Sequence, residues 1–133
     1  MNLLVDTHTL LWSIGKSSEL SRRALIELKN GNNNIFVSAI SLREIALKYS
    51  IGKLIIENID IKQIPEYCKK MGFQLIPLDP IESLNSFELP FRGKHKDPFD
   101  RMLIYQCIKN KYILLSQDDK LKIYKEDGLK YIW

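Results

Sequence analysis

Short apolar runs alternate with longer helical patterns along the chain. The apolar runs have the length and continuous hydrophobicity of strands that are buried on both faces. Strands are expected at residues 3–5, 35–37, 73–78 and 112–115. Helices are expected over residues 9–15, 18–30, 39–49, 61–71, 81–87 and 98–109. This alternation predicts an α/β fold with helices packed against a central parallel sheet.

Polar residues and glycines mark several boundaries of these elements. Ser38 directly follows a predicted strand and can cap the next helix. Asp97 precedes Pro98, as an N-cap precedes a proline in the first helical position. Gly72 interrupts a helical pattern before a strand. Without any visible repeat or linker, residues 1–133 are expected to form one domain.

The composition is that of an ordinary globular protein, because 45% of the 133 residues are hydrophobic and the charge is moderate. No targeting segment is visible, and no apolar run is long enough to span a bilayer. Cys68 and Cys107 lie within helical patterns and form no C-x-x-C pair. We therefore expect buried thiols in a cytoplasmic protein that does not bind membranes.

Four acidic residues occupy related positions in the predicted fold. Asp6 ends the first strand, and Asp118 lies just beyond the strand at residues 112–115. Glu44 lies on the helix that follows the second predicted strand. Asp100 lies in the first turn of the helix that precedes the last predicted strand. Ligands of parallel sheets bind beyond the carboxyl ends of the strands, near the point where the strand order reverses. All four acids can therefore converge on one rim.

Electrostatics limits what such a group of acids can be. Two carboxylates about 5 Å apart repel by roughly 3 kcal/mol at an effective dielectric near 20. Several such pairs would exceed the reserve of a marginally stable domain. The acids must lie apart, take up protons or share a cation. A hard divalent cation such as Mg²⁺ prefers oxygen ligands, so a metal site is a reasonable hypothesis.

The acids also have structural explanations. Glu44 follows Ser41 at the spacing of a capping box, although Ser38 is better placed as the cap. Asp97 and Asp100 match the N-cap and N3 positions of one helix, and capping is the favoured interpretation for Asp97. Strand ends do not generally need an acid, which leaves Asp6 the hardest to explain structurally.

The net charge of +4 rises to +8 for the remaining surface if four acids are committed to a metal. Such a surface favours a polyanion such as RNA or DNA. Basic residues cluster near the acids in the sequence: Arg43, Lys48, Lys53, Arg92, Lys94, Lys96 and Arg101. The candidates for nucleic-acid contacts are Arg43, Lys94, Lys96 and Arg101. For any single one of them, a solvated surface position is the simpler interpretation.

The two histidines have less specific surroundings. His8 stands where some metal-dependent hydrolases begin an H-x-H motif, but position 10 is Leu, so a second ligand is missing. His8 is expected to start or pack a helix. His95 lies between two lysines and could contact phosphate, but a solvated loop histidine is the favoured interpretation.

The residues around the acids form four segments in a fixed order. They are VDTHTLLW at 5–12, VSAISLREIA at 37–46, HKDPFDRMLI at 95–104 and LLSQD at 114–118. Together they closely resemble the PIN-domain family, in particular its VapC-type toxin ribonucleases. The resemblance covers essentially the whole chain.

This resemblance implies a three-layer α/β/α fold and an endoribonuclease that uses Mg²⁺ or Mn²⁺. By the resemblance, the catalytic and metal-binding acids are Asp6, Glu44, Asp100 and Asp118, and Asp97 is an additional acid of less certain role. Thr7 and Ser116 are expected to hydrogen-bond the ligands. The implied partners are RNA, a small cognate antitoxin and a second copy of the chain in a homodimer. The region around Trp12 is a candidate for the protein contacts.

Two other classes of function remain open. A catalytically silent PIN-like domain could bind RNA or protein, although retention of all four acids argues against it. A nucleotide-binding or signal-receiver domain would need other motifs. The first strand is followed by Asp-Thr-His-Thr rather than by glycines, and no phosphate-binding loop is present.

Overall fold

The computed structural model describes residues 1–133, and its centre is a five-stranded sheet. All neighbouring strands are parallel, in the order β3-β2-β1-β4-β5. The strands are β1 (Asn2–Val5), β2 (Asn34–Ser38), β3 (Gln74–Ile76), β4 (Ile113–Leu115) and β5 (Lys130–Ile132). The predicted parallel sheet is confirmed. The strand expected at 73–78 is shorter than predicted, and β5 was not predicted.

Helices connect the strands. The α-helices are α1 (Thr7–Gly15), α2 (Arg22–Lys29), α3 (Ala39–Ser50), α4 (Ile64–Lys70), α5 (Pro80–Asn85) and α6 (Pro98–Asn110). The 3₁₀ segments are η1 (Ser17–Glu19), η2 (Ile61–Gln63), η3 (Ser86–Glu88) and η4 (Asp119–Asp127). The helix predicted over 18–30 was wrong in its first turn. Leu20 is extended, and α2 begins only at Arg22, with Ser21 as the N-cap whose side chain accepts a hydrogen bond from Ala24 N. None of the helices is both long and apolar enough to cross a membrane.

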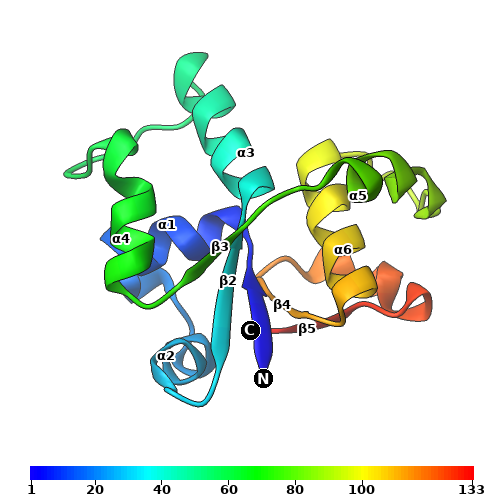
Figure 1. Ribbon diagram of the computed structural model, residues 1–133, viewed down its shortest axis with the longest axis horizontal. Helices are drawn as coiled ribbons and strands as arrows, with labels where there is room; N and C mark the ends of the chain where they lie inside the picture. The colour runs from blue at the N-terminus through cyan, green and yellow to red at the C-terminus, as the bar shows by residue number, and fades with distance from the viewer.

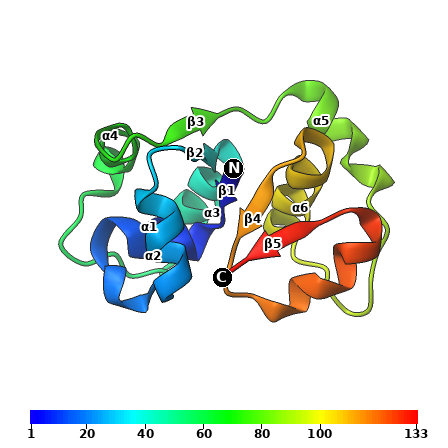
Figure 2. The ribbon, with the colours of Figure 1, turned by 90° about the horizontal axis from the view of Figure 1, so that it is seen from below.

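Two hydrophobic layers cover the sheet and give the predicted three-layer α/β/α arrangement (Figures 1 and 2). On one face, side chains of α1, α2 and α4 pack against Leu3, Val5 and Val37. On the other face, α6 and η4 pack against Leu4 and Leu114. The alternating side chains of β1 thus enter both layers, which is why its apolar run is continuous.

The strand order places β1 next to β4 at the centre of the sheet. The chain moves outward from β1 through β2 to β3, and then returns to the other side of β1 as β4. The carboxyl ends of β1 and β4 therefore form the point where the strand order reverses, which is where ligands bind in such sheets. The amide of Asp6 donates to Leu115 O at 3.2 Å, and this hydrogen bond joins the two strand ends.

The predicted caps and buried thiols are confirmed. Ser38 Oγ accepts a hydrogen bond from Ile40 N at 3.1 Å, and Asp97 Oδ1 accepts one from Asp100 N at 2.9 Å. Cys68 and Cys107 are free and buried, and burial raises the pKa of each thiol.

Gly128 ends η4 in the left-handed region, with a φ of 102°. An alanine there would meet only Ile108 Cγ2, at 3.7 Å, so backbone strain is the main expected effect. We expect Gly128→Ala to lower the free energy of unfolding by about 1–2 kcal/mol. Gly31→Ala is the control, because that position has neither a positive φ nor a neighbouring atom within 4 Å. Urea denaturation of both variants tests this, and equal stabilities would contradict it.

Candidate active site

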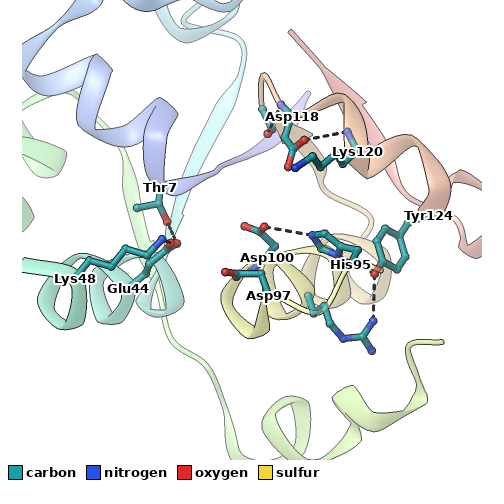
Figure 3. A network of polar contacts seen from close by, with 11 residues as sticks. Thr7, Glu44, Lys48, His95, Asp97, Asp100, Asp118, Lys120 and Tyr124 are labelled. Atoms are coloured by element: carbon teal, nitrogen blue, oxygen red, sulfur yellow. Dashed lines mark hydrogen bonds and ion pairs between the residues drawn. The ribbon is translucent and has the colours of Figure 1, made fainter. Parts of the chain in front are cut away.

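A pocket of about 110 Å³ opens at the carboxyl edge of the sheet, between α1, α3 and α6. Its polar lining consists of Asp6, Thr7, His8, Glu44, Lys48, Asp97, Asp100, Ser116 and Asp118. The structure therefore brings together all five acids named from the sequence, although they come from four separate segments of the chain. Figure 3 shows Glu44 on one side, Asp97 and Asp100 across from it, and Asp118 on the loop beyond them.

Two of the acids also act as N-caps. Asp6 Oδ1 accepts from Thr9 N at 2.8 Å at the start of α1, and Asp118 Oδ1 accepts from Lys120 N at 2.9 Å at the start of η4. Asp6 therefore has a structural role as the N-cap of α1, which its position at a strand end did not suggest. This cap was not identified from the sequence because the start of the helix was placed two residues too late, at residue 9 instead of residue 7. The hydroxyl of Ser116 accepts from the backbone amide of Asp118 at 3.1 Å and makes no hydrogen bond to a carboxylate of the pocket.

Glu44 is buried and has a partner for each oxygen. Thr7 Oγ1 donates to Glu44 Oε1 at 2.6 Å, as the expected contact between this hydroxyl and an acid. The ammonium of Lys48 donates to Glu44 Oε2 and forms an ion pair one helical turn further along α3. This hydrogen bond raises the pKa of Lys48, which is therefore charged at neutral pH.

Asp100 is partly buried beside a second carboxylate, that of Asp97. Burial, followed by the negative charge of Asp97, raises the pKa of Asp100 from 3.8 to about 6. A hydrogen bond with His95 opposes this shift, and the charge of Glu44 adds to it. Burial and a neighbouring carboxylate both disfavour the ionised form of an acid.

His95 is not the solvated loop histidine that the sequence favoured. Its side chain is only 10% exposed, because it lies between Asp100 Oδ2, 3.3 Å from Nε2, and the hydroxyl of Tyr124, 2.9 Å from Nδ1. Arg101 Nη1 donates to the same hydroxyl at 3.2 Å. The hydroxyl can then donate to His95 Nδ1, so that Nε2 of the neutral ring carries the proton and donates to Asp100.

The four candidate nucleic-acid residues have different surroundings. Arg101 donates to Leu89 O at 2.7 Å and to Pro90 O at 3.0 Å, so it anchors the loop before α6. Lys94 and Lys96 are exposed on that loop and line a shallow hollow of about 640 Å³ together with Lys120. This hollow shares Asp97, Asp100 and Asp118 with the pocket. Arg43 is exposed on α3 and lines neither of them.

The acids fit a hard divalent cation in charge and in donor chemistry. Asp6, Asp97 and Asp118 each use one oxygen as a cap, and Asp100 uses one with His95. The second oxygen of each of these four carboxylates accepts no hydrogen bond from the protein. No three His, Cys, Asp or Glu side chains are gathered closely enough to enclose an ion. An open arrangement still suits Mg²⁺, which keeps several waters and takes only one or two carboxylates directly.

Sequence reasoning missed the roles of three residues in the site. Lys48 was noted only as one of several basic residues, although its spacing of four from Glu44 is that of a helical ion pair. His95 and Tyr124 meet across 29 residues, and Tyr124 lies in η4, which was not predicted. No local pattern in the sequence could have indicated that contact.

An all-parallel three-layer fold with carboxylates at its switch point is the architecture of the PIN class of nucleases. The chain belongs to the PIN-domain family, because the profile of that domain matches residues 3–127. No curated protein matches the sequence.

Several solved structures share the fold. The first is VapBC2 from Rickettsia felis, solved bound to a DNA fragment from its promoter, with a TM-score of 0.65 and 20% identity over 99% of this chain and 98% of that chain. DNA-bound VapBC from Salmonella typhimurium has a TM-score of 0.63 and 15% identity over 99% and 97%. FitAcB from Neisseria gonorrhoeae has a TM-score of 0.62 and 14% identity over 98% and 96%. At these identities the similarity concerns the fold.

Proposed function

We propose that this chain is a metal-dependent endoribonuclease and the toxin of a type II toxin-antitoxin pair. The observation that carries the proposal is the convergence of five carboxylates, from four segments, on one pocket of a PIN domain. Burial and like charge raise the pKa of Asp100 to about 6, so the pocket has an excess of negative charge that a divalent cation would relieve.

Asp6, Asp100 and Asp118 are the proposed metal ligands, and Glu44 completes the acidic quartet. Asp97 adds charge and a free oxygen beside them. Bound in this pocket, Mg²⁺ or Mn²⁺ would activate a water and offset the charge of the phosphoryl oxygens. The protein's own part is to fix the orientation of the acids: the backbone amides of α1 and η4 hold Asp6 and Asp118, and His95 holds Asp100.

The proposed path of the RNA crosses the hollow beside the pocket. Lys94, Lys96 and Lys120 surround that hollow and can attract phosphates toward the acids. Arg101 supports the hollow because it anchors the loop before α6, which carries Lys94 and Lys96. Arg43 lies outside the hollow, on α3. These lysines can offset the repulsion between the acidic pocket and an anionic substrate.

The proposed partners are a small antitoxin and a second copy of the chain. Similarity to chains solved as VapBC2 and VapBC supports the antitoxin. Trp12 packs against Trp133 with ring centroids 5.8 Å apart, and it lines a surface hollow together with Ile55, the most exposed large apolar side chain. The other strongly exposed apolar side chains are Ile81, Leu84, Phe87 and Phe91, which are 71–78% exposed. Surfaces of this kind are typical of protein contacts.

Cleavage mapping on total cellular RNA tests the proposed function. We expect discrete cuts in Mg²⁺ or Mn²⁺, none in EDTA, and a loss of at least about 100-fold in Asp118→Asn, which keeps a capping side chain but loses the charge. Single-stranded DNA is tested in parallel. Cuts that persist in EDTA or in Asp118→Asn would contradict the assignment. A protein that binds RNA but neither cuts it nor gains thermal stability from metal would be a silent binding domain.

A further inference from the structure

The wall of the pocket formed by α3 carries a cation of the protein's own. Lys48 is the only lysine or arginine among the residues that line the pocket, and five acids line it too. Figure 3 shows its side chain running along α3 and ending beside Glu44, on the side that faces Asp97 and Asp100. Lys48 therefore lies on the pocket wall, beside the acids that a bound phosphodiester would approach.

Glu44 differs from the other acids because none of its oxygens is free. Thr7 Oγ1 donates a hydrogen bond to Glu44 Oε1 at 2.6 Å, and the ammonium of Lys48 donates one to Glu44 Oε2. The Glu44 side chain is 5% exposed, so this is not an ordinary surface ion pair. Removing the partner of a buried carboxylate leaves an uncompensated charge. Lys48 thus gives Glu44 a lysine ion-pair partner, and no other acid of the pocket forms an ion pair with a lysine or arginine.

Lys48 has hydrogen-bonding capacity left over. A lysine ammonium has three N–H donors, and only one is used here, by Glu44. The side chain is 34% exposed, so the two remaining donors can reach a ligand in the pocket. Ammonium groups bind phosphate oxygens as point charges.

We propose that Lys48 neutralises Glu44 and donates its free N–H groups to a phosphodiester oxygen of the substrate, while the metal is held by the acids on the opposite wall. This inference rests on the proposed function and deepens it. The α3 wall then recognises the phosphate. The wall formed by α6 and the ends of β1 and β4 holds the cation.

The metal-affinity test uses Lys48→Met, which removes the charge but keeps most of the aliphatic stem. Because Glu44 then becomes an uncompensated carboxylate, we expect Mn²⁺ to bind about threefold more tightly or better. Lys48→Arg keeps the charge and should bind Mn²⁺ as the wild type does. The matched control is Lys69→Met, which removes the same charge from an exposed position on α4 that makes no side-chain hydrogen bond or ion pair. Calorimetric titration of Mn²⁺ measures all four proteins.

The RNA-binding test uses a background that does not cleave. In Asp118→Asn protein, adding Lys48→Met should weaken the binding of single-stranded RNA about fivefold. It should also reduce the slope of log affinity against log salt by about 0.7, the value for one lost phosphate contact on a single strand. Adding Lys69→Met should leave the slope unchanged. A merely structural role of Lys48 would not change this slope.

The outcomes separate the two proposals. Tighter Mn²⁺ binding together with a smaller salt slope supports the role of Lys48. If either value equals that of Lys69→Met, the inference is wrong even though wild-type protein cleaves RNA. Wild-type protein that neither binds Mn²⁺ nor cleaves would overturn the proposed function and this inference together. If Lys48→Met does not fold, Lys48→Gln replaces it in both tests, with the same expectations.

Discussion

Asp100→Asn is expected to make the metal-free protein more stable while reducing RNA cleavage by about 1000-fold or more. Burial and the charge of Asp97 raise the pKa of Asp100 from 3.8 to about 6, so its ionised form is disfavoured in the fold. A shift of this size in an enclosed group corresponds to roughly 3 kcal/mol. The side chain is 37% exposed, so solvent screening reduces the expected gain to about 1 kcal/mol, or about 4 °C in Tm.

The dependence on pH identifies the source of this gain. Because the folded pKa is above the unfolded value, the fold holds a proton on Asp100 that the unfolded chain has lost between pH 4 and 6. Wild-type stability therefore falls as the pH rises through this window, and Asp100→Asn escapes that loss. The stability difference should be near zero at pH 4 and complete above pH 6, in EDTA.

Asp119→Asn is the matched control for Asp100→Asn. Asp119 is exposed beside Asp118 and does not line the pocket. We expect it to change neither the stability by more than about 0.5 kcal/mol nor the cleavage rate. A destabilised Asp100→Asn protein, or a gain independent of pH, would show that Asp100 is not repelled by its neighbours.

The parts of the fold that the sequence predicted well are those with a strong local signal. Leu3, Leu4 and Val5 are all fully buried, and a run buried on both faces is recognisable without its partners. The strand β5 has only three residues and begins with an exposed lysine. Its existence depends on pairing with β4, a contact between distant positions. The 3₁₀ segment η4 likewise lacks the sustained periodicity of an α-helix.

The candidate site was predictable to the extent that topology decides it. Asp6 and Asp118 follow adjacent strands, so a parallel sheet brings them together wherever the helices lie. The partners of the acids depended on three-dimensional packing. Tyr124 reaches His95 through η4, and both oxygens of Glu44 are taken by side chains from two different helices.

Helix N-termini explain how the fold tolerates its own acidic pocket. Asp6, Asp97 and Asp118 each accept a backbone hydrogen bond in the first turn of a helix, where partial positive charge favours an anion. Lys48 compensates Glu44. Asp100 also lies in the first turn of α6, but its carboxylate accepts no backbone hydrogen bond and pairs only with His95, and burial and the charge of Asp97 raise its pKa.

Two substitutions of Asp6 separate its structural role from its proposed metal-binding role. Asn caps helices about as well as Asp, so Asp6→Asn should stay within about 0.5 kcal/mol of the wild type in EDTA. Asp6→Ala removes the acceptor for Thr9 N and should lose about 1 kcal/mol, or about 4 °C in Tm. Both variants lose the carboxylate, so both should cleave RNA about 1000-fold more slowly or worse. Thermal unfolding and initial cleavage rates measure the two roles independently.

Ser21→Ala is the control for the loss of a cap alone. Ser21 Oγ accepts from Ala24 N at 3.0 Å at the start of α2, away from the pocket. This variant should lose about as much stability as Asp6→Ala and keep the full cleavage rate. At 100 times its Kd, Mn²⁺ should stabilise the wild type and Ser21→Ala by about 2.7 kcal/mol, and both Asp6 variants by much less. If Asp6→Asn cleaved RNA at the wild-type rate, Asp6 would not be a metal ligand. If Asp6→Ala were as stable as Asp6→Asn, Asp6 would not stabilise the fold as a cap.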